Sequence, residues 1–317
     1  MDVRLIRQVD SPTGRGPGNG MFALQRALRA ARPEWLHVGG QLRHGEMPWF
    51  WCWEDRLTAC ACAAVGMPLV IGPNMLFADW TAPCAVAGER ELCNAASCRL
   101  QFTESAWYRR WILDHCGPAM RAPIVLWPYP IGPLPAGPLP PACDLLIYEK
   151  GSLDRATVEK LTRRWPASVR FRYGRFRREK LLDAARRARA CAYLSNHDRG
   201  PLALAEILLC GCPAVGIARG APWIVDGVTG FTARSLAYDA LSDCPRPTCG
   251  AGVSPARAAG TAAPQKRGVD VGLALDDAIQ RAMTLERQAV RAAALKRFDA
   301  DKIVQTIICA LDAARWD

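Results

Sequence analysis

The 317-residue chain has only four histidines, and none of them stands at metal-ligand spacing from a cysteine or another histidine. Its 14 cysteines form no Cys-x2-Cys pair. The close pairs are Cys60-x-Cys62, Cys210-x-Cys212, Cys93-x4-Cys98 and Cys244-x4-Cys249. This spacing argues against both a zinc site and a disulfide framework. Several cysteines lie in Ala- and Leu-rich runs, where we expect each cysteine to act as a small, buried hydrophobic residue. We therefore expect no metal and a reducing, cytoplasmic location.

Long apolar runs are also missing. No stretch approaches the roughly 18 uninterrupted apolar residues of a membrane span, so we expect no transmembrane segment. The first ten residues, MDVRLIRQVD, are charged and contain too few apolar residues for a signal peptide. Half of the residues are hydrophobic and 22% are charged, which excludes global disorder. The length favours about two domains.

Lysine is absent from residues 1–142, which hold 13 arginines and 11 acidic residues and so carry a net charge of +2. Residues 143–317 hold 28 basic and 19 acidic residues, a net charge of +9. The second half is therefore the one expected to meet a polyanion, an anionic membrane or a phosphorylated ligand. The alternative is that an Arg- and Ala-rich composition reflects genomic base bias.

Short apolar runs alternate with helical patterns, which is typical of strand–helix–strand units around a parallel sheet. The expected strands cover residues 3–6, 35–38, 49–53, 68–71, 100–103, 124–127, 144–148, 168–173, 191–194 and 214–217. The expected helices cover residues 21–31, 56–65, 106–115, 153–165, 178–190, 202–209, 274–297 and 302–314. The pattern predicts an α/β protein with two Rossmann-like, doubly wound domains that face a cleft.

A proline-rich stretch divides the chain. Residues 128–142 contain seven prolines in 15 positions, so they form neither a helix nor a central strand and are expected to be a stiff connection. We predict an acceptor-side domain at 1–128, a linker at 129–142, a donor domain at 143–300 and a C-terminal helix at 301–317. An aperiodic stretch at 244–268 is predicted to be a flexible surface insertion. Ligands of such folds bind at the carboxyl ends of the strands.

A glycine-rich stretch, Gly14-Arg-Gly-Pro-Gly-Asn-Gly20, lies between the first expected strand and helix. Exposed amides there, at Gly18 and Gly20 among others, would suit a phosphate. The spacing is neither that of a P-loop nor GxGxxG, so a simple turn is the alternative.

Residues 191–234 are the most informative stretch. An expected strand is followed by Asp198, and a helix then carries Glu206, with seven residues between the two acids. The start of that helix, at Arg199, Gly200, Pro201 and Leu202, offers free amides to a diphosphate. A carboxylate just over one turn inside the helix suits the two hydroxyls of a ribose.

This stretch resembles the donor-binding motif of retaining, family-4-type glycosyltransferases with the GT-B fold: acid-x7-Glu, an Ala/Leu-rich helix, Cys-Gly-x-Pro, a strand and Asp-Gly-x-Thr-Gly, here 226–230. The resemblance implies that Glu206 holds the ribose of a nucleotide sugar and that Asp198 contacts the transferred sugar. It also implies retained anomeric configuration and no required metal. Asp198 replaces the usual glutamate and is one methylene shorter. The resemblance is strong over 143–234 and loose over 1–128.

Further residues follow from the same resemblance. Lys150, after an expected strand, is placed at the leaving diphosphate, with a solvated lysine as the alternative. Tyr173 and Arg175 end the next strand, where the family contacts the nucleobase. Ser105-x-Trp107 and Trp127-Pro128 resemble a phage and environmental branch, although residues 129–132 depart from its Gly-Ile-Asp pattern.

On the acceptor side, Glu54 and Asp55 end an expected strand and are the candidate residues that orient or deprotonate the acceptor hydroxyl. A solvated acidic pair is the alternative, and His37 and His44 are rival candidates.

Residues 163–189 hold 11 basic and two acidic residues, interleaved with Trp165, Phe171, Tyr173 and Phe176. Such a face suits DNA or anionic lipid; a solvated helix face is the alternative. The favoured acceptor is 5-hydroxymethylcytosine in DNA, the base being flipped from the stack. The alternatives are a lipid-linked or cell-surface glycan acceptor and a non-catalytic module that binds a nucleotide sugar or nucleic acid. The sugar, the nucleotide and the oligomeric state stay open.

Overall fold

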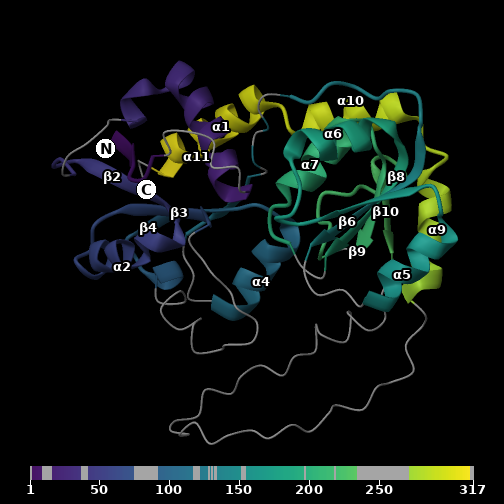
Figure 1. Cartoon of the computed structure of the whole chain (residues 1–317). Helices are drawn as coiled ribbons and strands as arrows, with labels where there is room; N and C mark the ends of the chain where they lie inside the picture. Colours follow the sequence, from purple (N-terminus) through teal and green to yellow (C-terminus); the bar gives the residue numbers. More distant parts are fainter. Residues whose placement is uncertain are drawn as a thin grey trace, which may run out of the picture.

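The computed structural model describes residues 2–8, 16–36, 42–74, 92–116, 122–127, 129, 131, 134–150, 155–195, 198–217, 219–233 and 271–314. Over these residues the chain forms two five-stranded parallel sheets with helices on both faces (Figure 1). The predicted fold class, an α/β chain with two Rossmann-like domains, is confirmed. The predicted insertion at 244–268 lies outside the described residues.

The first half carries the sheet β1-β2-β3-β4-β5. Its elements are β1 (Asp2–Leu5), α1 (Gly16–Ala31), the 3₁₀ turn η1 (Pro33–Leu36), β2 (Glu46–Cys52), the 3₁₀ turn η2 (Trp53–Asp55), α2 (Arg56–Ala64), β3 (Leu69–Asn74), β4 (Cys98–Thr103), α4 (Ala106–Cys116) and β5 (Ile124–Leu126). Successive strand residues point to opposite faces. Trp49 and Trp51 of β2 therefore pack with α1, while Phe50 packs with α2 and α4.

The second half carries the sheet β10-β9-β8-β6-β7. Its elements are β6 (Cys143–Lys150), α5 (Arg155–Arg164), β7 (Ser168–Arg172), α6 (Arg178–Arg187), β8 (Ala188–Ser195), α7 (Leu202–Leu209), β9 (Ala214–Ile217), β10 (Gly230–Ala233), α9 (Val271–Ala282), α10 (Arg287–Arg297) and α11 (Ala300–Ala314). Helices α6, α7 and α10 cover one face of this sheet, and α5 and α9 cover the other.

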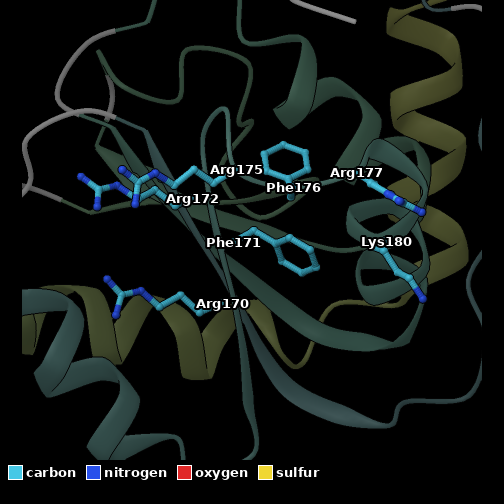
Figure 2. A pocket seen from close by; sticks show the side chains of 7 residues that line it. All are labelled: Arg170, Phe171, Arg172, Arg175, Phe176, Arg177 and Lys180. Carbon is cyan, nitrogen blue, oxygen red and sulfur yellow. The ribbon is translucent and has the colours of Figure 1, made fainter.

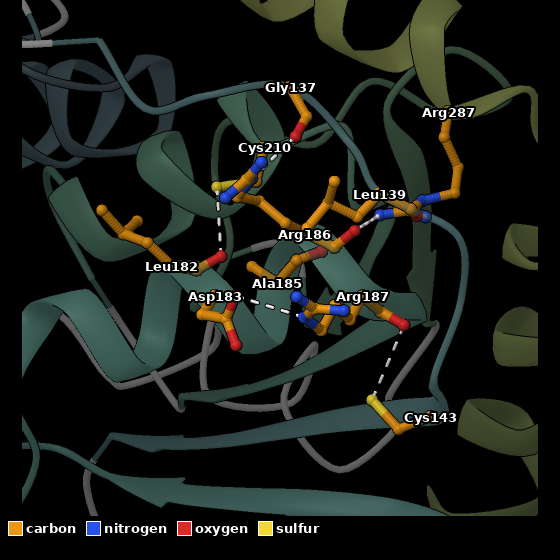
Figure 3. Close-up of polar contacts among 10 residues, drawn as sticks. All are labelled: Gly137, Leu139, Cys143, Leu182, Asp183, Ala185, Arg186, Arg187, Cys210 and Arg287. Atoms are coloured by element: carbon orange, nitrogen blue, oxygen red, sulfur yellow. Dashed lines mark hydrogen bonds and ion pairs between the residues drawn. The ribbon is translucent and has the colours of Figure 1, made fainter.

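Two connections join the halves. Helix α11, yellow in Figure 1, lies beside α1 of the first half, where Arg32 forms an ion pair with Asp312 at 3.2 Å. The proline-rich segment is the other connection, and it is not simply an exposed strap, because Tyr129 and Ile131 are buried in the core. Two arginines of α10 also hold it: Arg287 donates to the Leu139 carbonyl and Arg291 to the Pro135 carbonyl. Figure 3 shows the Arg287 contact.

Among the differences between the predicted elements and the structure, three change the type or the division of an element or its end next to β8. The strand predicted at 35–38 is wrong: η1 takes up residues 33–36, because Pro33 opens a tight turn that buries Trp35 and Leu36. The single helix predicted at 274–297 is two helices, since Glu286 caps α10 by accepting from the backbone amides of Gln288 and Ala289. The helix predicted at 178–190 ends at residue 187, where β8 begins.

Candidate functional site

The carboxyl edge of the second sheet brings the predicted donor residues together. Lys150 is the last residue of β6, and Asp198 follows the neighbouring strand β8. The Nζ atom of Lys150 lies 2.5 Å from Oδ2 of Asp198. The Tyr193 hydroxyl donates to the same oxygen at 3.0 Å. Asp198 is only 7% exposed, so its charge is held by these two partners rather than by water.

Two stacked tyrosine side chains lie beside the Lys150–Asp198 ion pair. Tyr148 and Tyr193 are opposite each other on β6 and β8, with ring centroids 5.0 Å apart and planes 13° apart. Burial raises the pKa of both hydroxyls, and the charge of Asp198 raises them further. Both tyrosines therefore stay neutral at physiological pH and keep their hydroxyl protons.

Glu206 lies on α7, whose start follows Pro201. Its side chain is 15% exposed, and Nε of Arg178 on α6 donates to its Oε1 at 2.6 Å. Burial raises the pKa of Glu206, while the Arg178 guanidinium opposes that rise. Arg178 is a site residue that the sequence reasoning missed; the only available signal was the basic run around it.

The helix start itself differs from the prediction. The Leu202 amide donates to the Gly200 carbonyl at 3.0 Å, so it is not a free amide. Arg199 is half-buried and packs against the first half: its guanidinium lies 5.0 Å from the Tyr108 ring and donates to the Tyr108 hydroxyl at 3.2 Å. The structure thus places Arg199 at the contact between the halves.

The loop after β7 carries the predicted nucleobase residues. Tyr173 is 48% exposed, and Nζ of Lys150 lies 5.2 Å from its ring centre. Next to it is an open hollow of about 500 Å³ (Figure 2). The hollow is lined by Arg170, Phe171, Arg172, Arg175, Phe176, Arg177 and Lys180.

The predicted aromatics have different surroundings. Phe171 and Phe176 pack edge to face at 5.7 Å, and they are half-buried because they line the basic hollow while also packing against the core. Trp165 is half-buried and donates to Asp276 at 2.9 Å. Of the four predicted aromatics, Tyr173 is the exposed one. The basic side chains remain at the surface of the hollow.

The two predicted acidic residues of the first half, Glu54 and Asp55, have different surroundings. Asp55 is buried, and Arg7 binds it through Nη2 at 2.8 Å and Nε at 3.1 Å. This carboxylate is therefore engaged in an ion pair. Glu54 is exposed at the same strand end, in η2. His44 is exposed in the turn before β2, and His37 lies outside the described residues.

The predicted glycine loop is not a loop at Gly18 and Gly20. Helix α1 begins at Gly16, so both glycines lie inside the helix. A Cβ atom at Gly20 would sit 2.4 Å from Cδ1 of Tyr129, which shows that the glycine permits close packing. A high glycine content is typical of a loop, but packing against Tyr129 decides in favour of the helix here.

Residues of the first half reach the donor loop across the contact between the halves, which we call the seam. Trp107 Nε1 donates to the Asp198 carbonyl at 3.0 Å, and Trp223 Nε1 of the second half donates to the Glu104 carbonyl at 3.1 Å. The carboxyl ends of the two sheets therefore face each other, as predicted. Glu104 was missed, although it follows an expected strand.

Within the described residues, no group of three or more His, Cys, Asp or Glu side chains is placed to hold a metal ion. The same part of the chain contains no helix with the length and apolar character of a membrane span.

No known protein-family model matches the chain, and no curated protein matches its sequence. Solved structures do match its fold. HepE of Anabaena in complex with UDP-glucose superposes with a TM-score of 0.63 at 14% identity, covering 99% of this chain and 100% of that one. The apo form of WaaB, a lipopolysaccharide outer core galactosyltransferase, gives 0.54 at 10% identity and covers 99% of both chains. The chain has the GT-B fold of two facing Rossmann-like domains.

Proposed function

We propose that the protein is a glycosyltransferase that moves a sugar from a nucleotide sugar, with a UDP-sugar favoured, to a hydroxyl acceptor. The observation that carries the proposal is the arrangement of two carboxylate–cation pairs, Lys150–Asp198 and Arg178–Glu206, along one carboxyl edge of a parallel sheet. Two pairs of this kind, next to a helix start, suit the sugar, diphosphate and ribose of one extended ligand. HepE, which shares the fold, was solved with UDP-glucose.

In the proposed reaction, the bond between the anomeric carbon and the diphosphate oxygen breaks, and the nucleoside diphosphate leaves with the electron pair. The acceptor oxygen forms the new bond to the anomeric carbon and gives its proton to an acceptor-side carboxylate. Lys150 stabilises the negative charge that develops on the diphosphate. Asp198 binds sugar hydroxyls, and Glu206 binds the ribose. Retained configuration is part of the proposal and rests on the motif.

Glu54 is the proposed acceptor-side carboxylate, because its side chain is exposed in η2, at the carboxyl end of β2. Asp55 stays a weaker candidate, since Arg7 occupies its carboxylate.

For the acceptor, we propose a 5-hydroxymethylpyrimidine in DNA, whose exocyclic hydroxyl is the nucleophile. The support is the charge of the second half and the hollow rich in arginine and lysine beside Tyr173. A lipid-linked or cell-surface glycan is the second candidate, favoured by the fold shared with WaaB, a lipopolysaccharide galactosyltransferase.

The test is an incubation of the protein with each common sugar nucleotide and with either hydroxymethylcytosine DNA or a lipid-linked glycan. The masses of the nucleosides and glycans are then determined by mass spectrometry. A hexose on the nucleoside supports the DNA acceptor, and a hexose on the glycan supports the alternative. Sugar-nucleotide binding without transfer to either acceptor would point to a non-catalytic binding module. No binding of any sugar nucleotide would overturn the proposal.

A further inference from the structure

The seam places a carboxylate of the first half directly under the donor loop. Glu104 follows β4 and is 3% exposed. A Cβ atom at Gly200 would sit 2.9 Å from Cγ of Glu104 and 3.1 Å from Cε2 of Tyr129. The backbone at Gly200 therefore rests against the Glu104 side chain, two residues after the donor acid Asp198.

The same loop has two further contacts with the first half. Trp107 donates to the carbonyl of Asp198, and Arg199 donates to the hydroxyl of Tyr108. Three consecutive residues of the donor loop, 198–200, are thus held by α4 and by Glu104, two residues before that helix. A loop fixed in this way keeps its geometry only while the two halves are docked.

The polar groups under the loop are not fully satisfied. Oε2 of Glu104 and the hydroxyl of Tyr129 are both buried, and no well-formed hydrogen bond reaches either atom within the described residues. The two groups are nonetheless close enough for Glu104 to raise the pKa of Tyr129. Buried polar groups in this state are costly, and they favour an arrangement that supplies a proton or lets water enter.

We propose that Glu104 is a positioning residue that supports the donor loop from the opposite half and makes donor binding depend on the docking of the two halves. This inference rests on the proposed function for its ligand, but the contact between Glu104 and the loop does not. Glu104 touches neither sugar nor nucleotide in this role; it acts through Gly200 on the placement of Asp198.

The charge state of Glu104 matters to this role. Burial raises the pKa of Glu104 to about 7, against the opposing charge of Arg199. The charged or titratable groups that face it are Arg199 and Asp198 of the donor loop and Tyr129 after β5. A buried carboxylic acid with a raised pKa favours the docked seam at low pH, and this advantage is lost as the pH rises through about 7. When the halves separate, water reaches the carboxylate and its pKa returns toward its ordinary value.

The experiment measures UDP binding to the full chain by calorimetry from pH 6 to pH 8. The affinity of wild type for UDP should fall about tenfold from pH 6 to pH 8, because the docked seam loses one bound proton over this range. The Glu104→Gln variant, neutral at every pH, should keep only the pH dependence that comes from the terminal phosphate of UDP, which loses its last proton at about pH 6; the tenfold loss is measured relative to this variant. The Glu159→Gln variant is the matched control: Glu159 is an exposed carboxylate on α5, and this change should leave the wild-type profile intact.

A second measurement needs no ligand. Hydrogen–deuterium exchange of the peptide that covers residues 198–202 should increase in wild type above pH 7, after correction for intrinsic rates, and should stay flat in Glu104→Gln. If wild type binds no UDP but shows this exchange profile, the proposed function fails and the seam inference stands. If Glu104→Gln follows the wild-type profile in both measurements, the inference is overturned while the proposed function is unaffected.

Discussion

Arg178 donates its Nε proton to Oε1 of Glu206 at 2.6 Å, and this pair joins α6 to α7 at the predicted ribose position. The carboxylate is mostly buried, which raises its pKa, and the Arg178 guanidinium opposes that rise and so favours the ionised form. An ionised carboxylate accepts hydrogen bonds from both hydroxyls of a ribose, whereas a protonated one loses part of that capacity. Arg178 therefore prepares Glu206 for the ligand.

Replacing either partner should weaken the nucleotide site. We expect Arg178→Ala to raise the Kd for UDP about tenfold, because the unpaired carboxylate in its buried place takes up a proton more readily. Glu206→Ala should weaken donor binding more than acceptor binding. Isothermal titration calorimetry with UDP checks both variants. Arg187→Ala, which breaks an exposed ion pair on the same helix, is the control and should leave the Kd unchanged. Equal losses for donor and acceptor would remove Glu206 from the ribose position.

Lys150 should matter more for turnover than for folding. Lys150→Met removes the cation beside Asp198, and kcat should fall by about 100-fold or more if this cation stabilises the leaving diphosphate. Stability should fall by only about 1–3 kcal/mol, since Asp198 keeps the hydrogen bond from Tyr193. Steady-state kinetics and urea unfolding separate the two effects. Lys296→Met, an exposed change on α10, is the control, and a kcat equal to that of the control would place Lys150 outside the site.

Local sequence predicted the elements whose limits are set by local chemistry. Helix α7 and strand β9 have the predicted bounds, because Pro201 precedes an apolar helix and Gly211, at a φ of 77°, ends it. The contact between Lys150 and Asp198 also follows from the strand order of the sheet, because both residues lie at the carboxyl ends of adjacent strands.

Contacts that depend on the docking of the two halves could not be predicted from local sequence. The support of Gly200 by Glu104 arises only when two sheets face each other, and no periodicity records that. The partner of Glu206 was missed for a similar reason: which face α6 turns toward α7 is decided by core packing. Tertiary packing also overrides the low helix propensity of the glycines in α1.

Gly20 offers a direct test of the two explanations for the glycine-rich stretch. If it serves packing, Gly20→Ala should destabilise the protein by about 1–3 kcal/mol, although alanine is the better helix former, because its Cβ would overlap the Tyr129 ring. The cost should shrink in a Tyr129→Leu background, which a double-mutant cycle in urea would reveal. Unchanged stability together with weaker UDP binding would instead favour the phosphate-loop hypothesis.

Arg287 should be one of the most costly residues to remove outside the site. Its guanidinium donates to the carbonyls of Leu139 at 2.7 Å, Arg186 at 2.6 Å and Ala185 at 3.2 Å, all drawn in Figure 3. It also donates to the carbonyl of Gly211 at 3.2 Å. It thereby ties α10 to the proline-rich connection and to the end of α6. Arg287→Ala removes one donor from each of these carbonyls, of which that of Arg186 keeps the Leu139 amide, and should cost about 2–4 kcal/mol in the free energy of unfolding.

Lysine should not rescue this position, because a single ammonium group cannot reproduce the planar fork that reaches carbonyls on separate elements. Arg155→Ala is the comparison: Arg155 is almost fully exposed on α5, and its loss should cost less than about 1 kcal/mol. Chemical denaturation of the three variants gives the ranking. An Arg287→Lys protein as stable as wild type would mean that one charge, rather than the shared hydrogen bonds, holds the connection to α10.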